Sequence, residues 1–112
     1  MKHIVHFVAA TSLLLVAGLV EASGNPSRGQ ELSSQVCASC HGVDGAMALA
    51  EEYPILAGQH RDYLVMALKA YRSGARDHAV MSSFARNLSD QDIDDLAVWF
   101  SRQDGLGELT FD

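Results

Sequence analysis

Two cysteines and a histidine lie together in the segment Cys37-Ala38-Ser39-Cys40-His41. This spacing, C-x-x-C-H, is the attachment signature of a c-type haem. The two thiols add to the two vinyl groups of the porphyrin and become thioethers, and the two intervening residues let one turn of chain span the distance between those groups. The adjacent imidazole then lies beneath the iron as an axial ligand. The sequence therefore predicts one covalent haem c, held by Cys37, Cys40 and His41.

Three other interpretations of these cysteines fit the sequence less well. A thioredoxin-like C-x-x-C needs a cysteine at the start of a helix, whereas an amphipathic helical pattern runs into Cys37 from the N-terminal side. A structural zinc site usually takes four ligands from two such pairs, and the chain has only two cysteines. A disulfide between Cys37 and Cys40 would close a very small loop and would leave His41 without a role.

The opposite face of the iron requires a second axial ligand. Met81 lies about forty residues after the motif, between two expected helices, which leaves enough chain to approach the haem from the far side. His78, one helical turn earlier, is its rival. Met47 follows His41 so closely that the intervening chain could not pass comfortably around the edge of the porphyrin, although a fully extended chain could reach that far. The remaining candidates lie inside or at the start of a helix, where packing or capping explains them: Met66 and His60.

A methionine ligand indicates a particular kind of function. Thioether ligation favours ferrous iron and raises the potential relative to two histidine ligands. With both axial positions filled, the iron has no open position for a substrate. The predicted pair of metal ligands, His41 and Met81, therefore favours electron transfer over catalysis.

Three segments carry the apolar periodicity and end signals of helices. Residues 26–35 follow Asn25 as N-cap and have proline at the first helical position. Residues 60–73 place their apolar side chains on one face and close at Gly74. A third helix follows the N-cap Ser89, with acidic residues in its first turn. No segment alternates as a strand does, so the sequence predicts an all-α domain.

Glycine and proline interrupt the helical pattern at informative places. Residues 53–59 are apolar but contain Pro54 and a glycine, which predicts a buried loop. Residues 47–52 are expected to form at most a loose helical turn, and residues 75–88 to be irregular or weakly helical. Gly29 lies inside the first helix, where it costs about 1 kcal/mol relative to alanine. Close approach of another helix or simple tolerance in the first turn explains it equally well.

The start of the chain, residues 1–22, is typical of a secretory signal peptide, which leaves residues 23–112 as one mono-haem domain. Lys2 supplies a positive start, residues 4–20 are mostly apolar, and the segment Val20-Glu21-Ala22 offers small residues at the sites that a signal peptidase reads. An uncleaved membrane anchor is the alternative, although this stretch is at the short limit for crossing a bilayer. Both interpretations place the domain outside the cytoplasm, in the periplasm, where bacteria attach haem covalently.

Size and charge limit the partners. A mature domain of about ninety residues buries a thin core, and with both cysteines committed to the motif an apolar porphyrin would serve as core and staple. The formal net charge is −6, which argues against nucleic acid and anionic lipid as partners. We expect redox proteins as donor and acceptor, docking by electrostatics, and no membrane insertion after signal cleavage.

Several blocks in the same order resemble the small bacterial class I c-type cytochromes, especially each half of the di-haem periplasmic cytochromes. The likeness covers about residues 26 to 103. With a single C-x-x-C-H, the chain resembles a mono-haem member. The matching blocks are Cys37–Gly42, Tyr53–Gln59, Tyr63-Leu64, Ala70–Gly74, Met81, Leu88–Ile93 and Leu96–Phe100.

The resemblance implies a cytochrome c fold, with three main helices and short helical turns packed around one haem. It implies that His41 and Met81 are the iron ligands. It also implies that Pro54 presents its backbone carbonyl to the other ring nitrogen of His41, which fixes the orientation and basicity of the ring. Gly29 would lie where the first helix crosses the last, near Trp99.

The function that this resemblance implies is periplasmic electron transport by a protein that is not itself an enzyme. Two alternatives stay open. The chain could be the haem c subunit of a periplasmic oxidoreductase complex. The chain could also be a haem sensor or peroxidase in which the bond to Met81 is labile. This alternative agrees less well with two filled axial positions.

Overall fold

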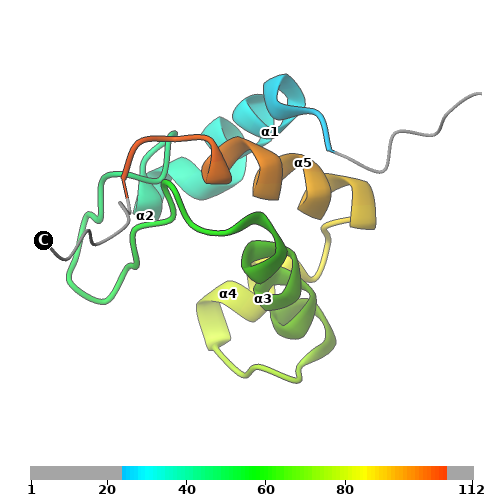
Figure 1. Cartoon of the computed structure of the whole chain (residues 1–112). Helices are drawn as coiled ribbons and strands as arrows, with labels where there is room; N and C mark the ends of the chain where they lie inside the picture. Colours follow the sequence, from blue (N-terminus) through cyan, green and yellow to red (C-terminus); the bar gives the residue numbers. More distant parts are fainter. Residues whose placement is uncertain (1–23, 106–112) are drawn as a thin grey trace, which may run out of the picture.

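The computed structural model describes residues 24–105, and Figure 1 shows them as helices joined by loops. Helix α1 spans Pro26–Leu32, and the side chain of Asn25 caps it by accepting hydrogen bonds from two backbone N–H groups. The predicted signal peptide, residues 1–22, lies outside the described residues and stays a prediction.

The first helical segment is longer than predicted. It continues from α1 through a π-helical turn, Ser33–Cys37, into α2, Ala38–His41. The expected end at residue 35 is therefore wrong. After Gly29, no proline or glycine interrupts the helical path before Gly42, which adopts a φ of +78° that glycine tolerates best. The helical path carries both cysteines and ends on His41.

The next two expected helices are confirmed, and a further one appears. Helix α3, Arg61–Ser73, ends at the left-handed Gly74, and α5, Asp90–Ser101, begins with a capping box at Ser89. Between them lies α4, Ala79–Ala85, a regular helix in the segment expected to be irregular or weakly helical. The side chain of His78 caps α4, a role for which histidine gives little sequence signal. Residues 47–52 contain turns and bends but no helix.

Figure 1 shows α1 and α5 packed together on one side of the molecule and α3 and α4 together on the other. Gly29 lies at the crossing of α1 and α5. A Cβ atom at this position would meet the carbonyl oxygen of Asp95 and would lie 2.8 Å from the Cβ of Trp99. Close approach of another helix, rather than simple tolerance, therefore explains the glycine.

A buried carboxylate fastens the start of α1 to α5. Asp95 is fully buried, and its side chain accepts hydrogen bonds from the backbone N–H of Asn25 at 2.6 Å and from the amide of Gln91 at 2.8 Å. Arg28 lies 3.2 Å from its other oxygen and also pairs with Asp92 at 2.9 Å. These bonds offset the cost of burying the charge.

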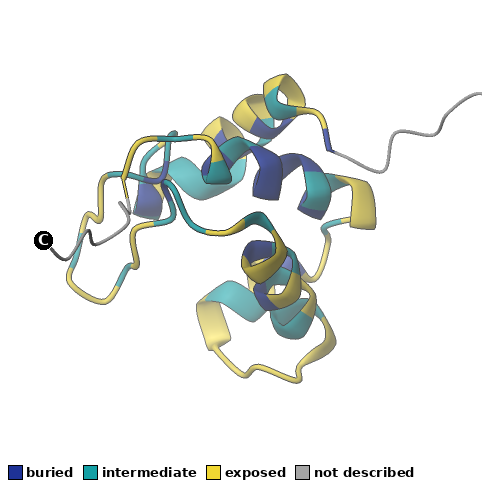
Figure 2. Ribbon diagram, viewed as in Figure 1, coloured by how far each residue is buried: buried dark blue, intermediate teal, exposed yellow. Residues whose placement is uncertain are grey.

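The apolar core is thin, as the sequence predicts. Nine apolar side chains are buried within residues 24–105, and four of them are alanines, so few large side chains fill the interior. Figure 2 shows buried residues concentrated on α5. Leu64 of α3 meets Leu96 and Phe100 of α5 in the main cluster. Within the described residues, no helix has the length and apolar content needed to cross a membrane.

Candidate haem-binding site

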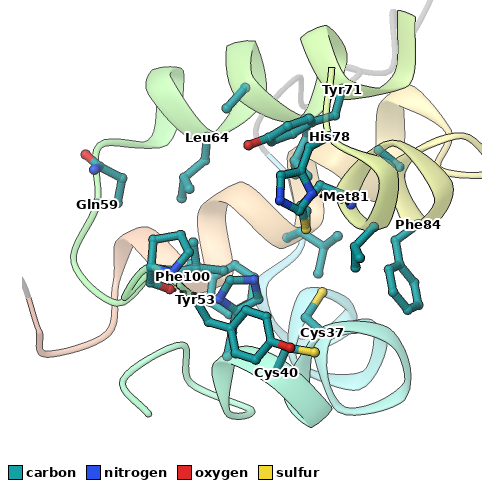
Figure 3. A pocket seen from close by; sticks show the side chains of 18 of the residues that line it. Cys37, Cys40, Tyr53, Gln59, Leu64, Tyr71, His78, Met81, Phe84 and Phe100 are labelled. Atoms are coloured by element: carbon teal, nitrogen blue, oxygen red, sulfur yellow. Dashed lines mark hydrogen bonds between the residues drawn. The ribbon is translucent and has the colours of Figure 1, made fainter. Parts of the chain in front are cut away.

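A cavity of about 410 Å³ opens between the two sides of the molecule, within the range of ~300–1,000 Å³ usual for cofactor sites. Side chains from α2, α3, α4, α5 and the loop that contains Pro54 line it, and most of them are aliphatic or aromatic. Figure 3 shows several of these side chains directed into the same space, among them Leu64, Tyr71, Met81 and Phe100.

His41 lies at the end of α2 with only 6% of its surface exposed. Its Nδ1 is 2.8 Å from the backbone carbonyl oxygen of Pro54. Because a carbonyl can only accept, Nδ1 carries the proton in this bond, and Nε2 keeps its lone pair for a metal. The ring lines the cavity.

The loop that presents this carbonyl is held by backbone hydrogen bonds. The N–H groups of Leu56 and Ala57 donate to the carbonyl of Gly45 at 2.8 and 3.2 Å. The loop is less buried than the sequence predicts, because Ala57 is fully buried whereas the side chain of Ile55 is 42% exposed. The carbonyl oxygen of Pro54 contacts the buried ring of His41, while Pro54 and Ile55 themselves line the cavity.

Cys37 and Cys40 both line the cavity as free thiols, and Figure 3 shows them next to each other on one side of it. Burial, followed by the charge of Cys40, raises the pKa of the Cys37 thiol to about 11. A redox-active C-x-x-C requires a lowered thiol pKa, so this environment disfavours the thioredoxin-like interpretation. Within residues 24–105, no group of three His, Cys, Asp or Glu side chains converges as a metal-ion site.

Met81 and His78 are the two sixth-ligand candidates that reach the cavity. His78 is already engaged, since its Nδ1 accepts a hydrogen bond from the backbone N–H of Met81 at 3.3 Å and its ring packs edge-on against Tyr71. Met47 and Met66 are 63% and 59% exposed and lie outside the cavity lining. His60 is also exposed and outside the lining.

The sequence did not predict one set of contacts, which positions the chain just after His41. The carbonyl oxygen of Val43 accepts a hydrogen bond from the hydroxyl of Ser33 and another from the indole of Trp99, each at 2.7 Å. These bonds tie the chain just after His41 to the π-helical turn and to α5. The only sequence signal was the tryptophan itself, which usually finds a hydrogen-bond partner for its N–H.

The residues present suit a haem group. An apolar cavity contains two thiols at C-x-x-C-H spacing, an imidazole whose Nδ1 is already bonded, and a thioether from a different helix. The bonded Nδ1 is the usual outer contact of a metal-ligating histidine. Fold and site together define a c-type haem protein.

The comparison with known families agrees. The family model described as cytochrome c matches residues 26–101, and the chain belongs to this family. It is a class I c-type cytochrome, and covalently bound haem c is the cofactor of the family.

The chain is similar to cytochrome c-554(548) of Halomonas halodenitrificans, with 46% identity over 71 residues, 61% of this chain and 84% of that protein. It is 40% identical to cytochrome c4 of Pseudomonas aeruginosa over 95 residues, covering 82% of this chain and 46% of that one. The crystal structure of reduced cytochrome c4 from Pseudomonas stutzeri superposes with a TM-score of 0.68 at 36% identity, over 75% of this chain and 48% of the other. The chain thus spans about half the length of the cytochromes c4 that it matches.

Proposed function

We propose that this protein is a periplasmic electron carrier whose haem is attached through Cys37 and Cys40 and ligated by His41 and Met81. The observation that carries the proposal is that His41 and Met81, from helices on the two sides of the molecule, line one apolar cavity. A haem with both axial positions filled transfers electrons and has no vacant position for a substrate.

The residues of this chain have separate tasks in that function. When bound, haem c supplies the one-electron couple of its iron. The bond from Nδ1 of His41 to the carbonyl of Pro54 fixes the ring and raises the basicity of Nε2. Met81 provides a soft sulfur donor that favours the reduced state. Most residues of the lining are aliphatic or aromatic, which would limit the contact of a bound haem with water.

The protein is proposed to exchange electrons with redox proteins and to catalyse no reaction of its own. The names of its relatives, cytochrome c-554(548) and cytochrome c4, support this view. The formal charge of −6 suits partners that carry a positive docking surface, because opposite charges accelerate encounter. The apolar leader in residues 1–22 supports export to the periplasm, with the haem domain in residues 23–112.

The test uses the full chain, produced with a c-type maturation system and titrated between its two oxidation states. We expect reversible one-electron behaviour, a Met–Fe(III) charge-transfer band in the oxidised protein, and no reaction of the reduced protein with carbon monoxide. Ready binding of carbon monoxide would instead indicate a sensor or a peroxidase.

Two methionine variants test the ligand assignment. Met81→Ala should lose the charge-transfer band. Met66→Ala, which removes an exposed methionine outside the cavity lining, should keep it. Persistence of the band in Met81→Ala would contradict the assignment of Met81 and leave His41 unaffected.

A further inference from the structure

Ser33 is a buried polar residue that electron transfer through His41 and Met81 does not explain. Its side chain is fully buried at the start of the π-helical turn, and its hydroxyl donates a hydrogen bond to the carbonyl oxygen of Val43 at 2.7 Å. This bond closes a loop of chain that contains both cysteines and His41. A single side chain therefore joins the helix before the haem-binding motif to the chain just after it.

Helix α5 holds the chain after the motif at two points. The indole of Trp99 donates to the same carbonyl oxygen of Val43 at 2.7 Å. The backbone carbonyl of Phe100, the next residue of α5, accepts a hydrogen bond from the N–H of Gly58 at 2.9 Å. Consecutive residues of α5 therefore fix the two ends of one segment, residues 43–58.

The carbonyl that holds the ring of His41 lies inside this segment. Pro54 accepts the hydrogen bond from Nδ1 of His41 at 2.8 Å. The N–H groups of Leu56 and Ala57 fasten the loop around Pro54 to the carbonyl of Gly45, which follows closely on the carbonyl held by the serine and the tryptophan. Both partners of the bond between His41 and Pro54 are thus attached to the same fixed segment, because the ring lies just before it and the carbonyl within it.

The strength of the bond from Nδ1 affects an iron bound at Nε2. A strong bond raises the basicity of the ring and gives the imidazole part of the character of its anion. Such a ligand stabilises ferric iron more than ferrous iron, because ferric iron carries the larger positive charge. A weaker bond from Nδ1 would therefore raise the midpoint potential.

We propose that Ser33 is a positioning residue for the iron ligand His41. Its bond to Val43 holds the chain after His41 so that the ring keeps its short bond to the carbonyl of Pro54, and it thereby lowers the midpoint potential. Trp99 supports the same carbonyl from α5. The inference rests on the proposed function, because it requires haem c in this cavity.

The experiment measures the midpoint potential of the purified, matured protein without any partner, at one pH and far below the unfolding temperature. Ser33→Ala removes the buried hydroxyl and should raise the potential. Ser34→Ala is the matched control, since Ser34 is exposed and its hydroxyl donates locally, to the carbonyl of Glu31 at 2.6 Å. The control should keep the parent potential.

A second measurement reports on the bond of His41 itself. In nuclear magnetic resonance spectra of the reduced protein with ¹⁵N-labelled histidine, the Nδ1 proton of His41 should move upfield in Ser33→Ala and stay in place in Ser34→Ala. A loss of stability alone would not move this resonance, because the folded protein produces it. If Ser33→Ala fails to mature, Trp99→Phe removes the other donor to Val43 and should shift the potential and the resonance in the same directions.

The outcomes separate this inference from the function on which it rests. A Ser33→Ala protein that unfolds more easily but keeps the parent potential and the parent resonance would overturn the role of Ser33 and leave the electron carrier intact. A changed potential with an unmoved resonance would overturn the route through His41, as would equal shifts in Ser34→Ala. Failure of the parent chain to hold haem would refute the proposed function.

Discussion

Replacement of Gly29 by alanine tests whether helix packing or helix propensity governs the crossing of α1 and α5. In an isolated helix the substitution would stabilise by about 1 kcal/mol. In this protein the new Cβ would meet the carbonyl oxygen of Asp95 and would lie 2.7 Å from its carbonyl carbon and 2.8 Å from the Cβ of Trp99. Two of these neighbours are backbone atoms that cannot rotate away, so the helices must separate.

The size of the effect follows from these contacts. Overpacking a tight contact costs roughly 1–3 kcal/mol, and a collision with backbone belongs at the upper end, about 3 kcal/mol. After the propensity gain of about 1 kcal/mol, the net loss is about 2 kcal/mol. For a domain of this size, each kcal/mol corresponds to roughly 4–8 °C in Tm. Gly29→Ala should therefore unfold about 8–16 °C below the parent.

Thermal and urea unfolding of the oxidised protein, followed by circular dichroism, would measure this loss. Gln30→Ala is the control, because Gln30 is exposed on the same helix and its replacement should change stability by no more than about 0.5 kcal/mol. A Gly29→Ala protein as stable as the parent would refute the account of the crossing.

Two further predictions concern α5. The backbone hydrogen bond with Ser89 is the main factor that lowers the pKa of Asp92. The ionised carboxylate therefore stabilises the fold above its unfolded pKa of about 3.9. This contribution is lost as the pH falls through the lower folded pKa. Asp92→Asn should flatten the decline of unfolding free energy at acid pH, and parallel profiles for the two proteins would contradict this. Trp99→Phe removes one of the two donors to Val43, the other being Ser33, and should cost about 1 kcal/mol in urea unfolding, whereas unchanged stability would show that this bond contributes nothing.

Features that depend on a few neighbouring residues could be predicted from the sequence. Asn25 and Ser89 as caps and Gly74 as a terminator were identified correctly, because each acts on backbone groups within a few residues. The C-x-x-C-H motif is local in the same sense. Its spacing alone indicated a haem, and the match to the cytochrome c family over residues 26–101 agrees with that cofactor.

Features that depend on distant parts of the chain were harder to predict. The helix that continues to His41 is stabilised by the bond from Ser33 to Val43, which is a tertiary contact. Helix α4 begins at a histidine cap, which propensity does not favour. Arg76, which lines the cavity, lies in a segment expected to be irregular or weakly helical, where a lone arginine gives no sign of a cavity. The carbonyl of Pro54 was anticipated only through the resemblance to a known family.

The most direct test of the central claim is whether haem stays on the polypeptide after complete denaturation. The matured protein would be unfolded and digested, and the peptide that contains residues 37–41 would be examined by mass spectrometry and absorption. We predict that this peptide carries the mass of one haem and that neither Cys37 nor Cys40 reacts with an alkylating agent. Haem that extracts freely, with both thiols open to alkylation, would contradict the claim.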